Sequence, residues 1–336
     1  MKHFNTEGVC RPDCHYMVKT DDNLAKIKSL IDRNKYIVLN RPRQFGKSTT
    51  LDLLQKVLEP QYAYVKTSLE RFPESAFTED NFCEAIKDLF IDYFEREETG
   101  LSEEAKTAFI STYEAWNNKP RMLALVRALR KMFKASDKRV VLAIDEIDHA
   151  ENHEVFFEFL NSLRSEYNDN PANTFQSVIL VGVSEINHLI NKARPEAQSL
   201  GMNRSPWNIA VSFGKSMDLP NSGIFEMLEE YKADHGLKFD AARMSDLLFE
   251  YTSGYPFLVS KLCYIIHSKL LETERFADLD AAWTREGFLA ALQILMSDRT
   301  VPLFQSLAGQ LEENKELITL TAGDCGAEDM ARGAIQ

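Results

Sequence analysis

A short segment near the start of the chain combines residue types that bind phosphate. The apolar residues 36–39 are followed at positions 40–49 by Asn-Arg-Pro-Arg-Gln-Phe-Gly-Lys-Ser-Thr. Gly46 has no Cβ, so the backbone can curl close to a phosphate, and the N–H groups at the start of a following helix would point at its charge. Lys47 can reach the β- and γ-phosphates, and the Ser48 hydroxyl can ligate Mg²⁺. This spacing predicts a phosphate-binding loop between a buried strand and a helix.

One position departs from the phosphate-loop pattern Gly-x-x-x-x-Gly-Lys-[Ser/Thr]. The first glycine of that pattern falls at position 41, where this chain has Arg41. A Gly-Lys-Ser tripeptide also arises by chance at ordinary helix starts that follow a turn. The interpretation therefore needs a second element to support it.

The second element is an apolar run that ends in two adjacent carboxylates. Residues 140–144, Val-Val-Leu-Ala-Ile, are typical of a strand buried on both faces of a parallel sheet, and Asp145 and Glu146 follow directly. Polar residues at the carboxyl end of such a strand face a ligand crevice. In P-loop ATPases the aspartate holds Mg²⁺, directly or through water, and the glutamate polarises the attacking water. Together with the loop, this strand predicts a site for ATP and Mg²⁺ with Glu146 as the catalytic base.

The other candidate residues surround these two elements. Ser48 and Asp145 are assigned to Mg²⁺. Ser184, at the end of the apolar run 178–183, is either a γ-phosphate sensor or part of an ordinary strand-terminal turn. The Arg43 side chain either contacts phosphate or is solvated. Asp148 and Arg164 are further candidates, which are either site residues or a helix cap and part of a surface charge pair. The full set of predicted nucleotide-binding residues is Arg43, Gln44, Phe45, Gly46, Lys47, Ser48, Thr49, Asp145 and Ser184.

The elements that must position these residues alternate along the chain. Apolar runs predict five strands, at 35–39, 62–67, 140–144, 178–183 and 208–213. Amphipathic stretches predict helices at 21–33, 48–58, 79–134 (with breaks near 97–102 and 117–120) and 155–167. Asp21 is the predicted N-cap of the first helix. This alternation predicts an α/β fold of the P-loop NTPase type, a parallel five-stranded sheet with flanking helices.

After residue 219 the sequence predicts helices without strands. Three helices are predicted at 224–235, 240–252 and 256–273, with the Ser-Gly-Tyr-Pro turn 253–256 before the last of them. Further helices are predicted at 285–316. The predicted domains are a nucleotide-flanking segment (1–20), the ATPase core (21–218), an all-α lid (219–275), a helical extension (276–320) and a disordered tail (321–336).

Composition and charge limit the classes of function. Of the 336 residues, 44% are hydrophobic and 27% are charged, as in ordinary globular proteins. The net charge of −12 argues against broad non-specific binding to nucleic acid or to a membrane surface. No apolar run approaches the length of a membrane span, and the first residues contain no apolar signal-peptide core. We therefore expect a cytoplasmic protein that does not cross a membrane.

Several short boxes carry a family resemblance. They are residues 4–8, 15–18, 41–48, 145–148, 205–210 and 254–256. On these boxes the chain resembles, over roughly residues 4–320, the AAA-like ATPases of the STAND-related group. That family has the ASCE type of P-loop fold, and the first glycine of its phosphate loop is commonly replaced. The resemblance implies an ATP-dependent switch whose helical lid senses the nucleotide, with Tyr16 or its neighbours flanking the adenine.

Three functions are compatible with these features. The first is an ATPase switch that hydrolyses ATP slowly and acts on an unidentified protein partner or effector. The second is a regulatory ATP-binding module without turnover, and the third is a P-loop small-molecule kinase. Glu146 favours the first, because a pure binding module needs no positioned base. Many members of the resembled family continue into a PD-(D/E)xK nuclease-like domain, which we expect this chain to lack.

Overall fold

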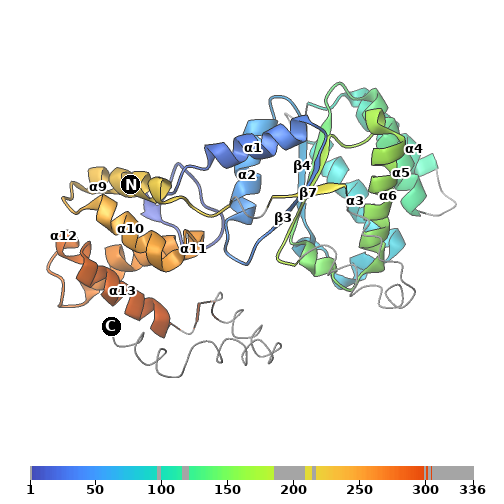
Figure 1. The fold of residues 1–336 in the computed structure, drawn as a ribbon. Helices are drawn as coiled ribbons and strands as arrows, with labels where there is room; N and C mark the ends of the chain where they lie inside the picture. Colours follow the sequence, from blue (N-terminus) through green and yellow to red (C-terminus); the bar gives the residue numbers. More distant parts are fainter. Residues whose placement is uncertain are drawn as a thin grey trace.

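The computed structural model describes residues 2–96, 100–115, 121–184, 209–213, 217–298, 300–301 and 304. In Figure 1 this part of the chain forms a sheet with helices on its faces and, beside it, a second group of helices. The predicted tail at 321–336 and most of the box at 205–210 lie outside the described residues.

The first part of the fold is a parallel five-stranded sheet. Its strands are β3 (Tyr36–Asn40), β4 (Ala63–Ser68), β5 (Val140–Asp145), β6 (Ser177–Gly182) and β7 (Ala210–Ser212). Their order is β4-β5-β6-β3-β7, and all neighbouring pairs are parallel. β6 thus lies between the strand that leads into the phosphate loop and the strand that ends in the carboxylates. The fold class predicted from the sequence is confirmed, with strand bounds that differ by one or two residues.

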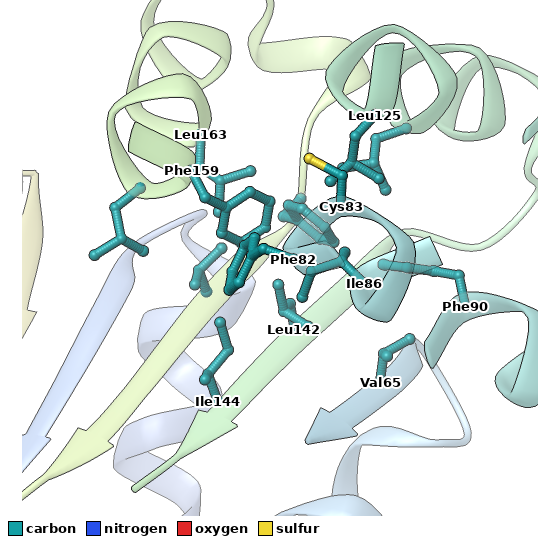
Figure 2. Close-up of a cluster of buried hydrophobic side chains, with 14 of the residues drawn as sticks. Val65, Phe82, Cys83, Ile86, Phe90, Leu125, Leu142, Ile144, Phe159 and Leu163 are labelled. Atoms are coloured by element: carbon teal, nitrogen blue, oxygen red, sulfur yellow. The ribbon is translucent and has the colours of Figure 1, made fainter. Parts of the chain in front are cut away.

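Helices cover both faces of the sheet (Figure 1). They are α1 (Asp21–Asp32) and α2 (Lys47–Leu58) on one face, and α3 (Glu79–Phe94), α5 (Arg121–Ala135) and α6 (Glu154–Asp169) on the other, with α4 (Glu103–Ala115) packed against α5. Successive strand residues alternate between the faces, because side chains of a strand point to opposite sides. Leu142 and Ile144 meet Phe82 of α3 and Phe159 of α6 (Figure 2), whereas Ala143 faces α1 and α2. This burial on both sides explains the unbroken apolar runs in the sequence.

The second part of the fold is helical, and we call it the helical body. Its helices are α9 (Asn221–His235), α10 (Ala241–Thr252), α11 (Pro256–Tyr264), α12 (Leu279–Ala282) and α13 (Arg285–Ser297). The single helix predicted at 256–273 changes its winding along its length. After α11 the chain continues through a π-helical turn (Ile265–Lys269) and a 3₁₀ turn (Leu270–Glu272). The predicted turn before α11 is present, with Gly254 in the left-handed region (φ 74°) and Pro256 as the first helical residue.

The N-terminal segment shares the hydrophobic core of the helical body. Two short strands, β1 (His3–Phe4) and β2 (His15–Tyr16), pair in parallel. Phe4, Tyr16 and Val18 are buried in one cluster with residues of α9, α10, α11 and α13. Because this cluster includes both the N-terminal segment and α13, packing does not separate residues 1–20 or 276–301 from the predicted lid. The predicted domain boundaries stay predictions.

The start of α1 corrects one prediction. Asp21 is the first residue of the helix and not its N-cap, a position that Thr20 occupies without a side-chain capping bond. Asp21 and Asp22 therefore place two carboxylates in the first turn, where the positive end of the helix dipole favours negative charge. The acidic pair supports the helix start electrostatically, which a sequence pattern does not distinguish from capping.

Candidate nucleotide-binding site

The phosphate loop runs from the end of β3 to the start of α2. Gly46 is the N-cap of α2 in the left-handed region, with φ of 77°, and a Cβ built there would have no heavy atom within 4 Å. Glycine is therefore favoured by the backbone conformation and not by crowding. Gln44 is also left-handed, with φ of 58°, which costs a non-glycine residue about 1–2 kcal/mol. This loop and the open N-terminus of α2 place backbone N–H groups as an anion site requires.

Lys47 is buried at the first position of α2. Its ammonium group donates to the carbonyl oxygens of Arg41 and Pro42, each over 2.9 Å. Burial lowers the pKa of Lys47, and the carboxylates of Glu146 and Asp145 act in the opposite direction. The side chain thus contacts the loop carbonyls and feels the charge of the two carboxylates at the carboxyl end of β5.

Ser48 and Asp145 meet directly. The Ser48 hydroxyl donates to Asp145 Oδ2 over 2.6 Å, and Asp145 Oδ1 accepts the N–H of Glu146 over 3.0 Å. Asp145 is only 4% exposed. A hydroxyl and a carboxylate in contact are oxygen ligands of the kind that Mg²⁺ prefers, with its other positions filled by phosphate oxygens and water. The two residues assigned to Mg²⁺ are therefore brought together.

Glu146 is partly exposed at the carboxyl end of β5. Its backbone is left-handed, with φ of 51°, a strained conformation for glutamate that is typical of functional sites. Burial raises the pKa of its carboxyl group; Lys47 opposes this shift, and the neighbouring Asp145 and Asp148 add to it. The carboxylate thus faces a partly dry, acidic environment beside Lys47.

Asp148, which the sequence left open as either a site residue or a helix cap, lies at the site. Its carboxylate accepts the N–H of Ser184 on Oδ1 over 2.8 Å and the N–H of Val183 on Oδ2. A Cβ on Gly182 would lie 2.7 Å from Asp148 Oδ2 and 2.7 Å from Ile147 Cγ1, so the close approach needs glycine. Asp148 therefore fastens the end of β6, including the predicted sensor residue, to the turn after β5. The available signal was the carboxylate three positions after Asp145.

Three predicted loop residues make other contacts. The Arg43 side chain is exposed, and its carbonyl accepts a hydrogen bond from the Tyr255 hydroxyl. The Phe45 ring is buried at 5% exposure and packs against Tyr255. The Thr49 hydroxyl accepts the N–H of Cys10 over 3.0 Å. These residues connect the phosphate loop to the helical body and to the N-terminal segment.

A cavity of about 100 Å³ lies beside the phosphate loop. Its walls come from the N-terminal segment, α1, α2 and the helical body. The lining residues are Cys10, Met17, Val18, Thr20, Asn23, Leu24, Ile27, Phe45, Gly46, Thr49, Thr50, Leu53, Phe213, Met217, Leu219, Met227, Pro256 and Ser260. Tyr16 does not line it, because its ring is buried in the helical body and its hydroxyl donates to Asp234 over 3.0 Å. Its neighbours Met17 and Val18 do.

The described part of the chain contains neither a metal cluster nor a membrane-spanning helix. Among the described residues, no group of three or more histidine, cysteine, aspartate or glutamate side chains could hold a metal ion. Within the same residues, no helix combines the length and apolarity that crossing a bilayer requires.

Solved structures of other proteins resemble the fold of this chain. The chain is similar in structure to a Walker-type ATPase of Pyrococcus abyssi, with 15% sequence identity, a TM-score of 0.51, and coverage of 93% of this chain and 79% of that one. A second match is the Aeropyrum pernix ORC1 protein solved in complex with DNA, at 12% identity and a TM-score of 0.42, covering 83% of this chain and 66% of that one. Among curated proteins, no sequence matches the chain.

The family comparison covers the phosphate loop and the acidic strand. The model of the family described as predicted AAA-ATPase matches residues 7–189, more than half of the chain. The matched region contains β3, β5 and β6 with their site residues, and the fold is that of an ATPase-type, nucleotide-binding P-loop protein. The chain therefore belongs to the predicted AAA-ATPase family.

Proposed function

We propose that the protein binds Mg·ATP between its phosphate loop and the end of β5, and hydrolyses it. The observation that carries the proposal is the contact of Ser48 with Asp145 over 2.6 Å at the N-terminus of α2. A phosphate loop and an acidic strand that meet in this way match the demands of phosphoryl transfer, which are positioning and charge stabilisation.

The residues present fit Mg·ATP. Ser48 and Asp145 would hold the metal ion, which when bound neutralises charge on the phosphates. Lys47 would exchange its loop carbonyl partners for β- and γ-phosphate oxygens, and the amides around Gly46 would cradle phosphate. Glu146 would orient and deprotonate the attacking water.

The cavity beside the loop suits the adenine base. Most of its walls are apolar, and the hydroxyls of Thr49 and Thr50 already bond to backbone groups. Asn23 brings a side-chain amide to the cavity, with a donor and an acceptor that match those on an adenine edge. Ser260 provides a second polar group from the helical body.

The switch role is part of the proposal. The helical body contributes Met227, Pro256 and Ser260 to the cavity, and the linker before α9 contributes Met217 and Leu219, so a bound base would touch both parts of the molecule. A ligand that contacts two bodies favours the arrangement in which both contacts are made. The helical body would then act as the predicted lid and pass the nucleotide state to a protein partner or effector.

Two substitutions test the assignment on one preparation. Lys47→Ala should abolish ATP binding, whereas Glu146→Gln should keep binding and slow single-turnover hydrolysis by about 10²–10⁴-fold. Lys56→Ala, which changes an exposed lysine of the same helix, is the matched control and should behave as wild type. Hydrolysis by Glu146→Gln at the wild-type rate would refute Glu146 as the base. Tight ATP binding without any turnover in wild type would instead favour the regulatory module.

A further inference from the structure

The loop position that lacks its glycine is tied to the helical body. Arg41 donates from its guanidinium to Asp218 Oδ1 over 2.7 Å, and the same group lies 4.4 Å from the centre of the Phe45 ring. The Phe45 ring in turn packs edge-to-face on Tyr255, with ring centres 4.7 Å apart. The Arg41 side chain is 19% exposed, so this ion pair and cation–π contact are partly shielded from water. The Arg41 side chain therefore connects the phosphate loop to Asp218, which a glycine at this position could not do.

Tyr255 holds one particular peptide group of the loop. Its hydroxyl donates to the carbonyl of Arg43, which belongs to the same planar peptide as the N–H of Gln44. In a trans peptide the C=O and N–H point in opposite directions, so a carbonyl turned toward the helical body turns this N–H away from it. Gln44 is the left-handed, non-glycine residue of the loop. Such a conformation persists only where its surroundings hold it.

Both contacts come from one small unit of the helical body. Asp218 lies in the linker before α9, and Tyr255 lies in the turn before α11. The N–H of Leu219 donates to the carbonyl of Gly254 over 2.9 Å, and a Cβ on Gly254 would lie 2.2 Å from the carbonyl oxygen of Leu219. The linker and the turn are therefore packed backbone to backbone. A displacement of the helical body would move both anchors of the loop together.

We infer that Arg41 and Tyr255 are positioning residues that present the Gln44 N–H to the phosphates of the nucleotide while the helical body is docked. The inference rests on the proposed nucleotide site. Because coupling between two equilibria is reciprocal, phosphate binding at the loop strengthens docking by the same factor by which docking strengthens binding. Because Arg41 stands in place of the glycine, nucleotide affinity in this chain would depend on a group of helices that is distant in the sequence.

The first test removes one hydroxyl. Tyr255→Phe keeps the ring against Phe45 and deletes the donor to the Arg43 carbonyl. Tyr251→Phe is the matched control, since it deletes a tyrosine hydroxyl from a side chain of the helical body that is 45% exposed. The Kd for Mg·ATP, measured by calorimetry, is expected to rise by about 2- to 10-fold in Tyr255→Phe, the range for one lost hydrogen bond, and to stay at the wild-type value in Tyr251→Phe.

The second test separates positioning from overall stability. Hydrogen exchange at the Leu219 amide reports the contact between the linker and the turn. ATP is expected to slow this exchange in wild type and to slow it less in Tyr255→Phe and Asp218→Asn. Exchange in β5 is expected to be the same in the two variants as in wild type. Arg41→Lys keeps the charge but loses the planar stack on Phe45, so it should resemble Asp218→Asn.

The outcomes distinguish this inference from the proposed function. If wild type binds ATP and Tyr255→Phe matches it in both Kd and Leu219 exchange, the positioning role is refuted and the proposed function stands. If wild type binds no ATP, the proposed function is refuted and the positioning role with it.

Discussion

The end of β6 is held against the turn that follows β5 by single residues. Asp148 accepts two consecutive N–H groups, from Val183 and Ser184, and Gly182 leaves the space that its carboxylate occupies. Ser184 is thereby placed by a side chain from the turn that follows β5 and not by its own turn alone. This favours the sensor interpretation of Ser184, because a sensor must keep its position relative to the base on β5.

At this scale we predict a selective loss of turnover in Asp148→Asn. An asparagine side chain has one acceptor oxygen, so one of the two N–H groups would face an NH₂ donor. Hydrogen bonds to charged groups contribute about 1.5–3 kcal/mol, so kcat should fall about tenfold or more, with the Kd for ATP near the wild-type value. Gly182→Ala should reproduce this effect and the exposed His149→Gln should not. A parallel rise in Kd in Asp148→Asn would contradict this split, as stopped-flow binding and phosphate release would reveal.

At the scale of elements, buried strands and amphipathic helices could be predicted because their patterns are local. The run 140–144 is apolar throughout since both of its faces are covered, and the carboxylates after it end the strand at the site. Contacts between distant elements leave no such pattern. The contact of Tyr255 with Arg43 and the burial of Tyr16 depend on how the helical body packs. Local patterns therefore predict the metal and phosphate residues, whereas the family resemblance placed Tyr16 or its neighbours beside the adenine, and of these Met17 and Val18 line the cavity.

The N-terminal segment offers a prediction about nucleotide occupancy. Cys10 lines the cavity, and its N–H is fixed to Thr49 of α2. Burial raises the pKa of its thiol to about 11, so alkylation by N-ethylmaleimide should be slow at pH 8. Mg·ATP should slow it further by covering the cavity, by about tenfold at a nucleotide concentration ten times its Kd. A Cys14→Ser, Cys325→Ser background, in which the other two cysteines (Cys83 and Cys263) are buried, isolates the signal in mass spectrometry, and Lys47→Ala in that background should lose the protection.

At the scale of the whole molecule, the helical body has a polar cluster inside an apolar core. Trp283 donates its indole N–H to the Tyr231 hydroxyl over 3.1 Å, and that hydroxyl lies 2.8 Å from His267 Nδ1. The His235 ring centre is 5.2 Å from that of His267. With the Tyr231 oxygen accepting from Trp283, its proton is free to bond to a neutral His267. The cluster therefore favours an uncharged imidazole.

Acid should loosen the helical body before the sheet. Burial, with a contribution from His235, lowers the pKa of His267 below its ordinary value of 6.5. As the pH falls, the His267 imidazole is protonated in the unfolded chain before it is protonated in the folded chain. The free energy of unfolding therefore has its full value above pH 6.5 and decreases as the pH drops below it. Each kcal/mol lost lowers the Tm by about 1–2 °C in a chain of this size. Calorimetry between pH 7 and 5.5 should show a smaller decline in His267→Gln than in wild type. A decline of equal size in both would exclude His267 as its source.

Among the described residues, the chain passes between the sheet and the helical body near Thr20 and again after Phe213, and Thr20, Phe213, Met217 and Leu219 all border the cavity. A body attached by two segments of chain rotates most easily about the line that joins them, because other rotations would stretch one of the segments. Atoms near that line move little, whereas atoms far from it move in proportion to their distance. In Figure 1, α12 lies at the end of the helical body that faces away from the sheet. The cavity thus lies close to this rotation axis, and a small rearrangement around a bound base would produce a larger displacement of α12.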